Sequence, residues 1–106
     1  MICDKCKRNF EEKAEKNKTY EGIDYHHNPP IFMFEKNEMW AGKIVLLCRK
    51  HHRELHDEIL KIMFKHSNLF KPKKSEHWTW IAILPCNRKK VIEEVMKFTK
   101  GWLNDS

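Results

Sequence analysis

Apolar positions gather in a few short segments of the chain, and their spacing predicts both strands and helices. Residues 44–47 form a continuous apolar run that predicts a short buried strand. From residue 49 to about residue 66, apolar side chains recur at the three- and four-residue spacing of an amphipathic helix. We expect the core face of this helix to consist of Leu55, Ile59, Leu60, Ile62 and Met63.

Upstream of this strand and helix, residues 19–25 alternate in part and are rich in β-favouring types, which predicts another strand. That strand leads through two histidines to Pro29 and Pro30, which end regular structure and force an extended exit. The apolar residues 31–34 that follow are expected to pack over the core.

Downstream, residues 78–84 are apolar and aromatic and predict a buried strand, which Pro85 ends. An apolar stripe from Val91 to Trp102 predicts a final helix, with Asn87 as its N-cap. These elements indicate an α+β fold in a single domain over residues 1–106. Its motif-bearing core would span about residues 1–66, with a strand–helix extension over about residues 76–104 packed on that core.

Charge and composition narrow the functional classes. The net charge of +6 favours an anionic partner, with nucleic acid ahead of a membrane surface. No apolar stretch approaches the length of a membrane span, and no signal region follows Met1. We therefore expect a cytoplasmic protein without a membrane partner. In that compartment disulfides are uncommon, so four cysteines beside seven histidines suggest metal binding.

Four potential metal ligands fall between positions 48 and 56, where the predicted strand meets the predicted helix. His52 and His56 lie four apart, so both imidazoles can reach one ion from the same helix face. Cys48 and His51 have the spacing in which two ligands bind one zinc ion at the end of a strand. This stretch can therefore serve two metal sites.

The start of the chain offers a second pair of ligands at the same spacing, Cys3 and Cys6. Together with Cys48 and His51 it supplies the four ligands of a tetrahedral structural zinc site. Cys86 has no partner at metal-binding spacing. We expect it to be a free thiol, with replacement of His51 as a ligand the minor alternative.

His26 and His27 are adjacent at the end of a predicted strand. On a regular strand they point to opposite faces, whereas a bulge or turn would bring both into one cleft. Arg49, Lys50 and Arg53 flank the other ligands and could contact phosphate, although a solvated surface role fits each of them equally well.

Taken in order, three motifs in the sequence resemble the HNH endonuclease pattern. They are Cys3-x-x-Cys6, His26-His27-x-x-Pro30, and Leu47-Cys48-x-x-His51-His52-x-x-x-His56. The resemblance covers roughly residues 1–58 and implies a ββα-metal core, two strands and a helix around one catalytic divalent ion. It further implies that His27 is the general base and that the catalytic ion is bound by His26, His52 and His56. The structural zinc knuckles would be Cys3, Cys6, Cys48 and His51, with His51 in place of the usual fourth cysteine.

One position departs from that pattern. The family has an Asn shortly before the Leu-Cys pair, and this Asn holds the loop that carries the base. Residues 41–44 contain no Asn, and the candidates to replace it are Asn28 and Asn37.

The function that these observations predict is hydrolysis of phosphodiester bonds in DNA, with RNA as the second choice of substrate. The cofactors would be a structural Zn²⁺ and a catalytic divalent ion such as Mg²⁺, Mn²⁺, Ni²⁺ or Zn²⁺. One alternative is a non-catalytic, zinc-stabilised module that binds nucleic acid. Another is an interaction protein that presents Trp78 and Trp80 to a partner.

Overall fold

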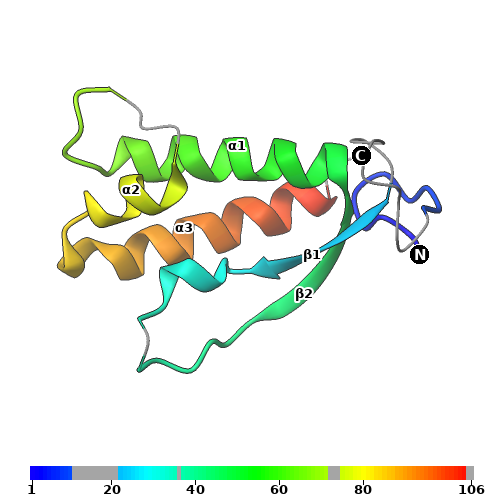
Figure 1. Ribbon diagram of the computed structural model, residues 1–106, viewed down its shortest axis with the longest axis horizontal. Coiled ribbons are helices and arrows are strands. Elements are labelled where there is room, and N and C mark those ends of the chain that lie inside the picture. Colours follow the sequence, from blue (N-terminus) through cyan, green and yellow to red (C-terminus); the bar gives the residue numbers. More distant parts are fainter. Residues whose placement is uncertain (11–21, 36, 72–74, 105–106) are drawn as a thin grey trace.

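The computed structural model describes residues 1–10, 22–35, 37–71 and 75–104 (Figure 1). In chain order the elements are strand β1 (Ile23–Asn28), a 3₁₀ turn η1 (Ile31–Met33), strand β2 (Lys43–Cys48), and helices α1 (Arg49–Lys65), α2 (Glu76–Ile81) and α3 (Pro85–Asn104). The protein is thus a small α+β domain, as the sequence predicts.

The two strands form an antiparallel sheet. The ladder runs without a bulge from the pair Ile23 and Cys48 to the pair Asn28 and Lys43. The predicted strand over residues 44–47 is confirmed. The other strand lies later than predicted: it includes both histidines, and residues 19–21 lie outside the described part of the chain.

Helix α1 follows β2 with no intervening loop, because its N-cap is the last strand residue, Cys48. Its predicted core face is confirmed in Leu55, Ile59 and Met63, which are fully buried. Leu60 and Ile62 are half-buried and pack against the same core.

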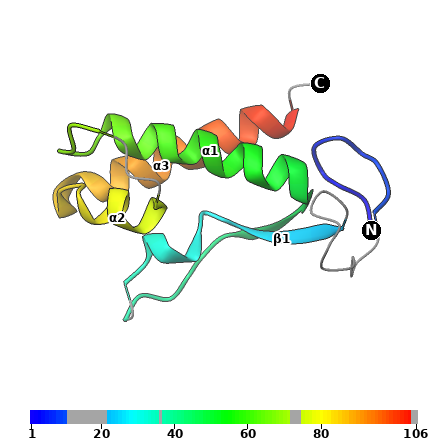
Figure 2. The ribbon, with the colours of Figure 1, turned by 45° about the horizontal axis from the view of Figure 1, so that its top comes forward.

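The helices form a layer over the sheet. Helix α3 runs beside α1 in the opposite direction, and α2 lies across the far end of the pair (Figure 1). After a 45° turn the strands still lie to one side of the helices (Figure 2). Helix α3 buries Val91, Val95 and Thr99 against this core.

The predicted strand over residues 78–84 is wrong, because its first half is the helix α2. Thr79, Trp80 and Ile83 are buried, whereas Trp78, Ile81 and Leu84 are exposed, which is helical rather than alternating spacing. Because nearly every residue of this segment is apolar, the helical spacing of its buried positions cannot be recognised in the sequence. Pro85 also has a different role from the one predicted: it is the first residue of α3, where a missing N–H costs nothing.

Asn87 was predicted as the N-cap of the last helix, but it lies inside α3, and its N–H donates to the Leu84 carbonyl at 2.8 Å. Trp80 belongs to the core, and Trp78 is 64% exposed. Among the described helices, none is long and apolar enough to cross a bilayer.

Candidate metal centres

The first ten residues fold into a tight loop that turns two thiols toward the rest of the chain. Ile2 bridges to Asn9, and the Cys3 N–H donates to the Arg8 carbonyl at 3.0 Å. Lys7 adopts a positive φ of 62°, which lets the chain reverse directly after Cys6.

Asp4 fastens this loop to β2. Its N–H donates to the Leu46 carbonyl at 2.7 Å, and the Leu46 N–H donates to its Oδ2 at 2.9 Å. This two-way contact resembles one rung of a β-ladder, and it sets the loop beside the end of β2, where Cys48 stands.

The predicted knuckle residues meet at this junction. The ligand atoms of Cys3, Cys6, Cys48 and His51 all lie within 4.8 Å of one another. His51 Nδ1 is 3.1 Å from the Cys48 sulfur and 3.9 Å from the Cys3 sulfur. Three thiols and one imidazole fit a closed tetrahedral zinc site, so this cluster, hereafter the knuckle, could hold a metal ion.

Burial affects the knuckle thiols in different ways. It raises the pKa of Cys48 to about 11, and the sulfurs of Cys3 and Cys6 add to the rise. Burial also raises the pKa of Cys3, but hydrogen bonds from backbone amides, that of Cys6 first, outweigh it and leave the pKa below its usual 9.0. The amide groups thus favour one thiolate, and a cation would be needed to stabilise several together.

A second cluster, hereafter the histidine cluster, joins β1 to α1. The ligand atoms of His26, His52 and His56 also lie within 4.8 Å of one another. His52 and His56 are one helical turn apart, as predicted, with ring centroids separated by 4.5 Å. The His26 ring lies 5.3 Å from His52 and 5.1 Å from His56, edge to face with both.

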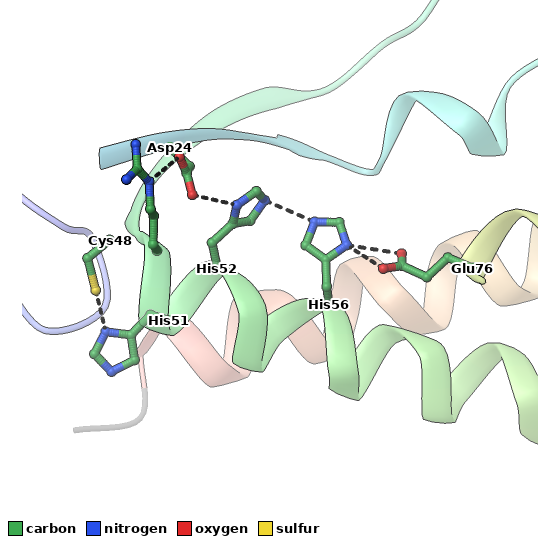
Figure 3. Close-up of polar contacts among 7 residues, drawn as sticks. Asp24, Cys48, His51, His52, His56 and Glu76 are labelled. Atoms are coloured by element: carbon green, nitrogen blue, oxygen red, sulfur yellow. Dashed lines mark hydrogen bonds and ion pairs between the residues drawn. The ribbon is translucent and has the colours of Figure 1, made fainter. Parts of the chain in front are cut away.

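Two carboxylates orient the helical histidines (Figure 3). His52 Nδ1 lies 3.1 Å from Asp24 Oδ2, and His56 Nδ1 lies 2.8 Å from Glu76 Oε1. Because an ionised carboxylate only accepts hydrogen bonds, each Nδ1 carries the hydrogen, and in the neutral ring each Nε2 presents a lone pair.

These lone pairs face one another. His52 Nε2 and His56 Nε2 are 2.9 Å apart, and two acceptors at that distance need a proton or a metal ion between them. His26 Nε2 is buried and has no hydrogen-bond partner in the described part of the chain. The donor set therefore fits a divalent ion bound by three imidazoles.

Two rings of the histidine cluster, His26 and His52, favour the uncharged form. Burial, followed by the neighbouring histidines, lowers the pKa of His26 to about 3. Burial also lowers the pKa of His52, although its hydrogen bond to Asp24 opposes the shift. A neutral imidazole is the form that binds a metal, so both rings are held ready as ligands.

A cleft of about 430 Å³ opens over the histidine cluster. All three cluster residues line it, and so does His27. The ladder is regular at both residues, so β1 has no bulge at the two adjacent histidines, and both residues nevertheless line this cleft. Its other walls are Tyr25, Pro30, Ile31, Phe32 and His77.

The three predicted phosphate contacts lie outside that lining. Arg49 Nε is 3.7 Å from Asp24 Oδ1, so it stands beside the carboxylate that orients His52. Lys50 and Arg53 are exposed on the first turn and a half of α1. Cys86 is an exposed free thiol outside the knuckle, as predicted.

Sequence reasoning missed Asp24 and Glu76 as site residues. Asp24 stands two positions before His26 and therefore shares its strand face, which is a pattern that could have identified it. Glu76 belongs to α2 and stands just before residues 78–84, which were wrongly predicted as a strand. Nothing in its local sequence indicates a contact with His56.

No protein-family model, curated protein or solved structure matches this chain.

Proposed function

We propose that this protein is a metal-dependent endonuclease of the HNH type that hydrolyses phosphodiester bonds in DNA. The observation that carries the proposal is the convergence of three imidazoles from β1 and α1 in a cleft that a fourth, His27, also lines. A strand pair followed directly by a helix, with these ligands on it, is the arrangement that the ββα-metal core requires.

In this mechanism His27 accepts a proton from a water molecule in the cleft. The water oxygen then forms a bond to phosphorus as the bond from phosphorus to the 3′ oxygen breaks. The 3′ oxygen keeps the electron pair of that bond and takes a proton from the solvent. An imidazole is well suited to this step because it exchanges a proton near neutral pH. His27 stays outside the ligand set, so its ring nitrogens remain available.

A divalent ion held by the histidine cluster would supply positive charge against the phosphate and the departing 3′ oxygen. Asp24 and Glu76 keep the helical imidazoles in the tautomer that binds it. Among the predicted ions, nitrogen donors favour Zn²⁺ and Ni²⁺ over Mg²⁺, which prefers oxygen. The knuckle would hold a separate structural zinc.

The test is a plasmid-nicking assay with Ni²⁺, Zn²⁺, Mn²⁺ and Mg²⁺ supplied separately. We expect metal-dependent nicking by the wild type and a loss of about 100-fold or more in His27→Ala, since general-base catalysis contributes on that scale. His66→Ala is the matched control, because His66 pairs with Glu94 at 2.6 Å and lies outside the cleft lining.

Cleavage that is equal in His27→Ala and the wild type would contradict the proposal. The absence of cleavage, together with one bound metal per chain at saturation, would favour the non-catalytic nucleic-acid-binding module. A second ion that is lost in His52→Ala would exclude that module.

A further inference from the structure

Trp40 joins the segment before β2 to the turn that follows β1. Its Nε1–H donates to the Pro29 carbonyl at 2.7 Å. Its ring also packs edge to face against the His27 imidazole, with centroids 5.1 Å apart and planes at 79°. One half-buried side chain thus contacts the chain on both sides of Asn28.

Gly42 shows how closely these two segments approach. A Cβ at this position would lie 2.3 Å from the Asn28 carbonyl oxygen and 2.9 Å from Pro29 Cδ. It would also lie 2.9 Å from Trp40 Cζ2. Any larger residue would force the backbone of residue 28 or the indole to move, so glycine is required for this contact.

We propose that Trp40 is a positioning residue for His27. The indole fixes the turn through the Pro29 carbonyl and restricts the imidazole through the ring contact, so the base faces the cleft in one orientation. In this role Trp40 replaces the Asn that, in the HNH pattern, holds the loop carrying the base. The inference rests on the proposed function, because it needs His27 to act in catalysis.

A purely structural role for Trp40 makes different predictions. Trp40 belongs to neither cluster of ligands and does not line the cleft, so its effect must pass through His27 or through general stability. If Trp40 contributes only to general stability, its substitution lowers the fraction of folded protein. If Trp40 positions His27, its substitution lowers kcat in protein that is fully folded and fully loaded with metal.

The experiment compares wild type, Trp40→Phe, His27→Ala and the double variant in steady-state cleavage of a DNA oligonucleotide with saturating Ni²⁺. Trp40→Phe keeps an aromatic ring and removes the N–H donor. We expect kcat to fall about 10- to 100-fold, as small misplacements of a catalytic group do. We expect KM and the number of bound metal ions to stay unchanged.

The double variant is decisive. If Trp40 acts through His27, then Trp40→Phe causes no further loss in the His27→Ala background. Trp78→Phe is the matched control, because Trp78 is an exposed tryptophan on α2 outside the cleft lining. Gly42→Ala adds a Cβ that would displace Trp40 or the backbone of residue 28. It should therefore lower kcat while KM and the number of bound metal ions stay unchanged.

Wild-type rates in Trp40→Phe, or losses that multiply in the double variant, would overturn the inference while leaving the nuclease proposal intact. A wild-type protein without metal-dependent cleavage would overturn both. If Trp40→Phe does not fold, as judged by circular dichroism, the decision passes to Gly42→Ala in the same cycle with His27→Ala.

Discussion

At the scale of single residues, two carboxylates orient the helical imidazoles of the histidine cluster. Glu76 spans His56 Nδ1 with both oxygens, at 2.8 and 3.0 Å. It comes from α2, outside the segment that resembles the HNH pattern. The C-terminal part of the chain therefore supplies a hydrogen-bond partner to the histidine cluster.

Glu76→Gln should weaken metal binding at the histidine cluster by about 10- to 100-fold, the usual effect of losing such an outer partner. The amide can still contact His56 but no longer offers a negative charge to its N–H. Competition between the protein and a zinc-sensitive chelator measures this, with the knuckle loaded beforehand. Glu58→Gln is the control, since Glu58 pairs with Lys61 on the surface at 3.0 Å. Equal affinities in the three proteins would contradict the assignment.

The cluster residues between Cys48 and His56 could be named from the sequence because their spacing is local. Cys3 and Cys6 were added by matching two pairs of ligands, and His26 by the resemblance to the HNH pattern. Cys48, His51, His52 and His56 follow from the geometry of a strand end and one helical turn. Glu76 could not, because its approach to His56 depends on where α2 folds back along α1. A contact 20 residues away in sequence is set by tertiary packing, not by the pattern around it.

At the scale of elements, one acidic residue ties the end of α1 to the middle of α3. Glu94 Oε1 lies 2.8 Å from Lys65 Nζ, and Glu94 Oε2 lies 2.6 Å from His66 Nε2. These partners, Lys65 first, hold the pKa of Glu94 below its usual 4.5. His66 is the C-cap of α1 and also contacts α3 through Glu94.

The lowered pKa of Glu94 gives its ion pairs a defined pH dependence. Their stabilisation is present above pH 4.5 and is lost as the pH falls through the lower pKa of the folded state, because the unfolded chain then binds the proton more readily. Glu94→Gln should lower the free energy of unfolding at pH 7 by less than about 1 kcal/mol, since the pairs are solvent-screened. Urea unfolding across the acid range measures the difference from wild type, which should close below pH 4.5.

The neighbouring Glu93 supplies the control for that prediction, because it is exposed on the same turn of α3. Glu93→Gln should show no such pH-dependent gap. A gap in Glu94→Gln that persists unchanged at low pH would mean that packing, not charge, joins the two helices.

Elements in which polar and apolar residues recur with a clear period could be predicted from the sequence, whereas the element without such a period was predicted wrongly. Residues 49–65 show polar and apolar faces, and the helix there was predicted to within a residue. The one polar residue in the segment 78–84, Thr79, is buried, so no polar positions mark an exposed face, and the aromatic and β-branched types suggested a strand. In the structure Thr79, Trp80 and Ile83 are buried at helical spacing instead.

At the scale of the whole molecule, the chain places its knuckle at one end of the helix layer. The Lys5 ammonium donates to the Trp102 carbonyl and lies 4.8 Å from the centre of the indole ring. His51 also faces Trp102, with centroids 6.2 Å apart. The last turns of α3 therefore pack against the knuckle. Loss of a metal ion from the knuckle would consequently destabilise the packing of the helix layer.

Cys6→Ser tests the contribution of the knuckle to folding. We expect bound zinc to fall from two ions per chain to one after mild chelation, as the two clusters predict. The melting temperature should fall by about 4–8 °C for each kcal/mol of metal-binding free energy lost. Native mass spectrometry and thermal denaturation measure the two effects.

Cys86→Ser is the matched control for that substitution, because Cys86 is an exposed thiol outside both clusters. It should retain both ions and the wild-type melting temperature. If Cys6→Ser retains two ions and melts like the wild type, the knuckle is not a structural zinc site.

His51 and His52 are consecutive, yet His51 points to Cys48 of the knuckle and His52 points to His56 of the histidine cluster (Figure 3). Each residue of an α-helix turns the side-chain direction by about 100°. The contacts of these two residues therefore fix the rotation of α1 about its own axis at two points. One residue added between them would turn one ring by about 100° relative to the other, so the two clusters could not both keep their ligands together.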